Sequence, residues 1–144
     1  LFPIFDETLE LRGYVARSYT GAEPKALTYK EEGYSGAAWF QTGFVPTKAL
    51  IVVEDPVSAM AVMQFGIDSV ALLGTHLSPE AIEQIQAANY TEVLIALDAD
   101  AFVKCIENAQ KLQQSKVLQL EKDIKDMNFE ERKQLLAQYK QEVE

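Results

Sequence analysis

Short apolar stretches separated by turn residues dominate the first 45 positions of the chain. Turn residues such as those at positions 6–8 and 20–21 interrupt the apolar runs every few residues, which is typical of short strands joined by tight turns. We expect strands at residues 2–5, 11–19 and 37–41. This spacing predicts a small antiparallel sheet at the N-terminus.

From residue 46 onward, continuous apolar runs alternate with segments of helical periodicity. Runs rich in Val and Ile are typical of strands buried on both faces of a parallel sheet, and strands that alternate with helices imply right-handed crossovers. Pro56 suits the first turn of a helix, and Ser78 is a helix cap followed by a proline. We expect strands at 49–54, 69–73, 92–97 and 116–120, and helices at 57–65, 79–89, 100–114 and 129–143.

The predicted fold class is therefore α/β: a parallel four-stranded sheet flanked by helices, with a small N-terminal antiparallel β subdomain. The change of pattern places the division between a β-rich part at residues 1–45 and an α/β part at residues 46–144. A chain of 144 residues is long enough for one compact core with such an appendage.

Composition narrows the classes of function. The net charge of −9 disfavours strong autonomous binding to nucleic acid, so metal ions or separate basic groups would have to supply the attraction. The single cysteine, Cys105, excludes an internal disulfide and a cysteine-rich zinc site, and it fits a reducing compartment. No apolar run is long enough to cross a membrane. We therefore expect a cytoplasmic protein without membrane partners.

Acidic residues follow two of the predicted parallel strands. Glu54 ends the run that starts at Ala49, and Asp98 and Asp100 end the run that starts at Glu92. Because ligands of open α/β sheets bind at the carboxyl ends of the strands, we expect these carboxylates to share one edge. Carboxylate oxygens suit Mg²⁺ or Mn²⁺, which indicates phosphate chemistry.

Each of these residues also has a plain structural interpretation. Glu54 could be a solvated acid at a helix start, and Asp100 could cap the following helix. Gly74 could let the backbone approach a phosphate closely or simply form a tight turn, and these interpretations carry equal weight. His76, the only histidine, is more simply a surface residue.

The segment 49–101 resembles a TOPRIM domain in the order of its motifs. Ala-Leu-Ile-Val-Val-Glu ends at Glu54, Leu-Gly-Thr follows at 73–75, and Asp-Ala-Asp stands at 98–100. The flanks are similar to bacterial and phage primases of the DnaG type. On the N-terminal side these are the Phe-Pro-Ile-Phe-Asp segment at 2–6, Arg12-Gly13-Tyr14 with Arg17, and Pro24-Lys25; on the C-terminal side they are residues 117–126, with their acidic loop.

This resemblance implies roles for individual residues. Glu54, Asp98 and Asp100 would be the catalytic acids and bind Mg²⁺ or Mn²⁺, with Asp123 of the acidic loop as a further metal ligand. The nucleotide or template contacts would come from Arg17, Lys25, Gly74 and Thr75. Phosphoryl transfer depends on charge neutralisation by metals and cations, which agrees with this set of residues.

The implied function is the catalytic core of a DNA primase, which makes RNA primers from ribonucleotides on single-stranded DNA. Its expected partners are the template, the ribonucleotides, and a zinc-binding or helicase domain elsewhere in the parent protein. Two alternatives use the same acids: a metal-dependent TOPRIM nuclease, and a catalytically decayed module that binds nucleotide or a replisome partner. Three departures from the primase pattern are Asp55 in place of glycine, Ser58 in place of an acid, and Val103 in place of glycine.

Overall fold

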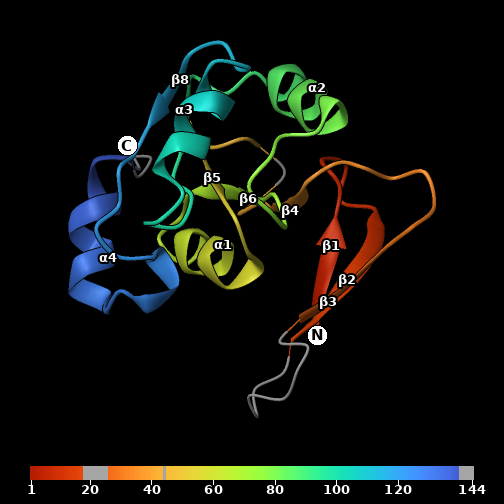
Figure 1. Ribbon diagram of the computed structural model, residues 1–144, viewed down its shortest axis with the longest axis horizontal. Helices are drawn as coiled ribbons and strands as arrows, with labels where there is room; N and C mark the ends of the chain where they lie inside the picture. Colours follow the sequence, from red (N-terminus) through yellow and green to blue (C-terminus); the bar gives the residue numbers. More distant parts are fainter. Residues whose placement is uncertain (18–25, 44, 140–144) are drawn as a thin grey trace.

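A computed structural model describes residues 1–17, 26–43 and 45–139 (Figure 1). The N-terminal part is a three-stranded antiparallel sheet of β1 (Phe2–Phe5), β2 (Leu11–Arg17) and β3 (Ala26–Lys30). The first two strands confirm the predictions at 2–5 and 11–17, while positions 18 and 19 of the predicted second strand lie outside the described residues. The third was not predicted, because its exposed Leu27 and Tyr29 give no clear apolar-inside pattern.

The second sheet has five strands in the order β4-β6-β5-β7-β8. They are β4 (Ala38–Phe40), β5 (Ala49–Val53), β6 (Asp68–Ala71), β7 (Glu92–Ile95) and β8 (Ser115–Val117). The last four are parallel to one another, as expected, whereas β4 is antiparallel to β6. Placing 37–41 in the small N-terminal sheet was therefore wrong. All three residues of β4 are buried although β4 is an edge strand, because Ala38 and Phe40 pack into one core of the larger sheet and Trp39 packs into the other.

Four helices cover this sheet: α1 (Pro56–Met63), α2 (Pro79–Ala88), α3 (Phe102–Ala109) and α4 (Phe129–Leu136). Two 3₁₀ turns flank α4, namely η1 (Ile124–Asp126) and η2 (Ala137–Tyr139). Ser78 caps α2 through a hydrogen bond from the Ala81 amide, as predicted. Helix α3 is shorter than the expected 100–114 and has no side-chain cap at its start.

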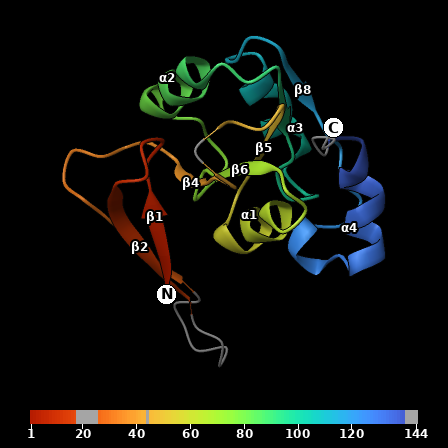
Figure 2. The ribbon, with the colours of Figure 1, turned by 180° about the vertical axis from the view of Figure 1, so that it is seen from behind.

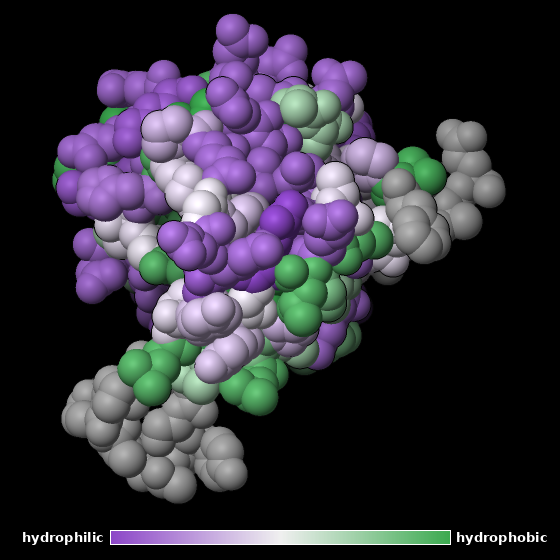
Figure 3. Space-filling model, turned by 90° about the vertical axis from the view of Figure 1, so that its right-hand side faces the viewer, coloured by the Kyte–Doolittle hydropathy of each residue, from purple (hydrophilic) through white to green (hydrophobic). Residues whose placement is uncertain are grey.

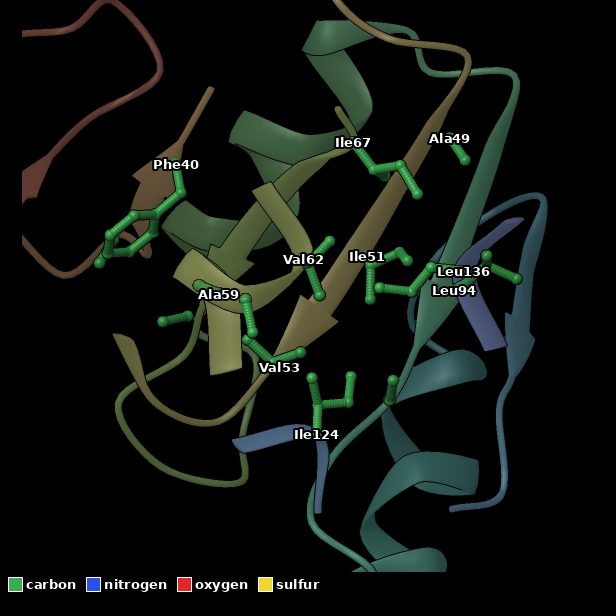
Figure 4. Packing of buried hydrophobic residues seen from close by; sticks show 14 of the residues in the cluster. Phe40, Ala49, Ile51, Val53, Ala59, Val62, Ile67, Leu94, Ile124 and Leu136 are labelled. Carbon is green, nitrogen blue, oxygen red and sulfur yellow. The ribbon is translucent and has the colours of Figure 1, made fainter. Parts of the chain in front are cut away.

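The two faces of the larger sheet bury different sets of side chains. Ile51 and Val53 pack with α1 and α4 on one face, and Leu50 and Val52 pack with α2 and α3 on the other, as the alternation of side chains along a strand requires. In Figure 4, Ile124 of η1 lies next to Val53 at the end of β5. This contact fixes η1 close to the carboxyl edge of the sheet.

The N-terminal sheet shares the first of these cores, through Ile4 and Val15. Both ribbon views show α1 between this sheet and α4 (Figures 1 and 2). Seen from the side of the N-terminal sheet, the surface is largely hydrophilic with separate hydrophobic patches (Figure 3). Among the described residues, no helix combines the length and the apolar character that crossing a membrane requires.

Candidate active site

The register of the parallel strands brings the predicted acids to one edge. Val52 pairs with Ile95, and the Ala96 amide donates to the Val52 carbonyl at 2.8 Å. Glu54 and Asp98 therefore leave neighbouring strands side by side. On the other side of β5, the Leu73 amide donates to the Glu54 carbonyl at 2.7 Å. The carboxyl ends of three strands meet at this edge, as the sequence predicted.

Glu54 carries the most perturbed carboxyl group of this edge. Burial raises its pKa to about 7, and the charge of Asp98 and a hydrogen bond between the two carboxyl groups act in the same direction. Its Oε1 atom is buried and has no hydrogen-bond partner among the described residues. A buried carboxylate oxygen without a donor, next to a second carboxylate, is a chemically suitable place for a cation.

Asp55 and Lys125 form an ion pair at the same edge, which the sequence analysis missed. Asp55 caps α1, because its Oδ1 accepts a hydrogen bond from the Ser58 amide at 2.9 Å. Its other oxygen, Oδ2, lies 3.1 Å from Lys125 Nζ, and Asp98 Oδ2 lies 3.4 Å from the same ammonium. The only signal in the sequence was a lysine two positions after the predicted ligand Asp123.

The segment around Asp98 is held by the acidic loop. Burial raises the pKa of Asp98, although the Lys125 ammonium opposes that rise. The Asp123 carboxylate accepts a hydrogen bond from the Ala99 amide at 2.7 Å, so it lies against the Asp98–Asp100 segment. Asp100 is exposed and does not cap α3, whose cap position is Ala101.

Only part of this edge suits a divalent ion. Glu54 and Asp98 offer carboxylate oxygens, and one of these oxygens has no hydrogen-bond partner within the described ranges. Lys125 already neutralises Asp55 and the other side of Asp98. Across residues 1–17, 26–43 and 45–139, no three His, Cys, Asp or Glu side chains are grouped so that they could hold a metal ion. The four-residue set of Glu54, Asp98, Asp100 and Asp123 stays a prediction.

The predicted nucleotide contacts are described only in part. Gly74 lies at the edge, but a Cβ atom there would meet nothing within 4 Å, so no close approach inside the protein requires glycine. The left-handed backbone is instead at Leu73, with φ of 60°. The Thr75 carbonyl accepts a hydrogen bond from Asn108 Nδ2 at 2.7 Å, which ties this loop to α3. The Arg17 side chain and Lys25 lie outside the described part.

A pocket of about 230 Å³ lies between the acid edge and the N-terminal sheet. One wall is the cross-strand row formed by Phe2, Val15 and Thr28, which are paired in register on β1, β2 and β3. The opposite wall comes from the strand ends and from η1: Glu54, Asp55, Pro56, Leu73, Gly74, Asp98 and Lys125. The small N-terminal sheet thus forms one wall of the pocket.

Two of the departures from the primase pattern, Val103 and Ser58, add no charge to the acid edge. Val103 is 66% exposed, so its bulk meets no closely packed helix. Ser58 is buried in α1, and its hydroxyl has no hydrogen-bond partner among the described residues. The serine therefore adds neither charge nor a hydrogen bond to the acid edge.

Comparisons with known proteins identify a domain family and similar folds. The model of the Toprim domain family matches residues 48–125. The chain is also similar in structure to a DnaG primase catalytic domain bound to ssDNA, with a TM-score of 0.73 and 23% identity over 96% of this chain and 49% of that one. A search of curated proteins by sequence finds no match.

Two further solved structures show the same likeness. The RNA polymerase domain of Mycobacterium tuberculosis primase DnaG has a TM-score of 0.68 and 21% identity, covering 95% of this chain and 52% of that one. The E. coli primase catalytic core has a TM-score of 0.65 and 24% identity, covering 93% and 51%. The chain has the fold of these domains and spans about half of their length.

Proposed function

The chain belongs to the Toprim domain family, and we propose that it is the catalytic core of a DNA primase, which joins ribonucleotides into RNA primers on single-stranded DNA. The observation that carries this proposal is the extent of the likeness to primase domains. It covers 96% of the chain, well beyond the matched residues 48–125. It therefore includes the N-terminal sheet, whose residues face the acids across the pocket.

In this proposal Glu54 and Asp98 hold a divalent ion, Mg²⁺ or Mn²⁺, with Asp100 and Asp123 on the same edge. The unpartnered Glu54 oxygen supports this assignment. When bound, the ion neutralises negative charge on the phosphates of the incoming ribonucleotide and favours attack by the primer hydroxyl.

The remaining roles belong to groups that bind and orient the nucleic acid. Arg17 and Lys25 contact nucleotide phosphates or the template, and Gly74 and Thr75 contribute backbone groups from the loop after β6. A chain of net charge −9 repels phosphates, so these two cations and a bound metal ion are needed to hold the substrate. The row Phe2, Val15 and Thr28 limits the space on the opposite side.

The test is primer synthesis by the full-length protein on single-stranded DNA, with labelled ribonucleotides and Mg²⁺ or Mn²⁺. We expect RNA products that require both template and metal. Glu54→Gln and Asp98→Asn should each lower the rate by about 100-fold or more, because each removes charge at the metal position. The matched control is Glu83→Gln, an exposed position on α2, which should retain wild-type activity.

The same reactions separate the alternatives. Metal-dependent cutting of the DNA without RNA products, lost in Glu54→Gln, would replace the proposal with a nuclease. Absence of both products, under conditions where a bacterial primase makes primers, would refute catalysis by this edge.

A further inference from the structure

The Lys125 ammonium lies inside the acid edge rather than at its rim. Its Nζ atom is 3.1 Å from Asp55 Oδ2 and 3.4 Å from Asp98 Oδ2. The Lys125 side chain is 23% exposed, and those of Asp55 and Asp98 are 18% and 16% exposed. Among the described residues that line the pocket, it is the only cationic side chain.

Contacts from several sides hold the backbone of η1, which carries Lys125. Ile124, 1% exposed, anchors the turn in the core. Arg132 of α4 donates from Nε to the Ile124 carbonyl at 3.0 Å and from its Nη2 atom to the Lys125 carbonyl at 3.1 Å. Asp123 binds the Ala99 amide. The fold therefore positions the Lys125 stem so that its ammonium reaches the acids.

The negative charges at this edge are balanced differently on its two sides, the side of Asp55 and the side of Glu54. Asp55 Oδ2 and Asp98 Oδ2 face the ammonium, whereas Glu54 Oε1 is buried and has no hydrogen-bond partner in the part of the chain that the structure describes. Paired metal ions in phosphoryl-transfer sites lie about 3.5–4 Å apart. An ammonium in contact with Asp55 and Asp98 supplies positive charge at the carboxylates that one ion of such a pair would use, and its charge repels a second divalent ion.

We propose that Lys125 is a built-in cation that occupies one of two cation positions at this edge, so that the chain binds a single divalent ion, on the Glu54 side. The proposal rests on the proposed function only in placing an ion at Glu54. Because the ammonium is covalently attached, one positive charge stays at the edge at any metal concentration.

The experiment is Mn²⁺ titration of the full-length protein, with free Mn²⁺ followed by electron paramagnetic resonance and heats by calorimetry. We expect one ion per chain for the wild type and two for Lys125→Asp, because the new carboxylate replaces the cation by a ligand. Lys125→Met retains the aliphatic stem and should bind its ion at least about tenfold more tightly, since a repelling charge is gone.

The control is Lys122→Met, which makes the same charge change on the same loop. Lys122 Nζ pairs with Glu131 at 3.1 Å, away from the pocket lining, so Mn²⁺ binding should match the wild type. Circular dichroism and thermal unfolding check each variant. Lys125→Met provides the test if Lys125→Asp does not fold.

The outcomes separate this inference from the proposed function. Wild-type stoichiometry and affinity in the folded Lys125 variants would overturn the role of Lys125, even if the protein makes primers. Binding of Mn²⁺ only after Lys125 is replaced would overturn the single-ion proposal, because the wild type would then bind no ion, and it would also count against the proposed primase activity, which depends on that ion.

Discussion

Replacing Glu54 by glutamine should stabilise the metal-free protein, although the residue stands at the centre of the proposed active site. The carboxyl group is half-buried and faces Asp98, and no described residue donates a hydrogen bond to its Oε1 atom. Glutamine has nearly the same shape, carries no charge and brings its own donor. The substitution therefore removes a repulsion that the folded chain otherwise contains.

The size of the effect follows from the pKa of Glu54. A rise from the ordinary value of 4.5 to about 7 corresponds to about 3 kcal/mol, at about 1.4 kcal/mol per pKa unit. Because the folded-state pKa is raised, the folded chain binds the proton more tightly than the unfolded chain. The contribution of this group to stability is therefore complete below 4.5 and is lost as the pH rises through about 7.

The assay is urea unfolding of the wild type and Glu54→Gln in the presence of a chelator, over a range of pH. At about pH 8 the variant should be more stable by about 1 to 3 kcal/mol, and at about pH 4 the two should coincide. Glu83→Gln, at an exposed position of α2, should show no such dependence. Equal or lower stability of Glu54→Gln at about pH 8, or a difference that does not change with pH, would refute the reasoning.

Two further predictions concern residues that stabilise the fold around the site. Ile124→Ala should lower the free energy of unfolding by about 2–5 kcal/mol, and Ile124→Val by only about 0.5–1.5, because the side chain is buried next to Val53 and truncation leaves a cavity; equal losses in urea unfolding would contradict this. Asp6→Asn should destabilise the protein at neutral pH, and the difference should shrink as the pH falls below 3.8. Burial alone would raise the pKa of Asp6, yet hydrogen bonds from Thr8 and Arg12 lower it below 3.8, so this stability is lost as the pH falls through the folded-state pKa; a thermal-unfolding difference that stays constant as the pH falls would contradict the assignment.

The local pattern of apolar residues was sufficient to predict the central strands and the proximity of the acids. The runs ending at Val53 and Ile95 are apolar at almost every position and rich in Val, Ile and Leu, which is typical of a strand buried on both faces. Neighbouring parallel strands end at the same edge, so Glu54 and Asp98 had to be close. The motif order also indicated the family, which the match to residues 48–125 bears out.

Periodicity was less informative where burial depends on neighbours. The helical spacing of Phe102, Cys105 and Ile106 places them on one face and favours burial of all three, yet Phe102 and Ile106 are 38% and 40% exposed, while Cys105 is buried. Helix α3 is short, and only part of its apolar stripe meets the sheet. Strand β3 went unpredicted for a similar reason, because two of its larger side chains face outward.

The sequence by itself determined the α/β class, the central strands and the identity of the acids at the edge. Only the tertiary structure placed β4 beside β6, turned the N-terminal sheet toward the acids, and brought Lys125 to Asp55, 70 positions away in the chain. Hydrophobic periodicity indicates on which face of its own helix or strand a residue lies. An ion pair or strand pairing between distant segments depends instead on how the whole core packs, and no local pattern contains that information.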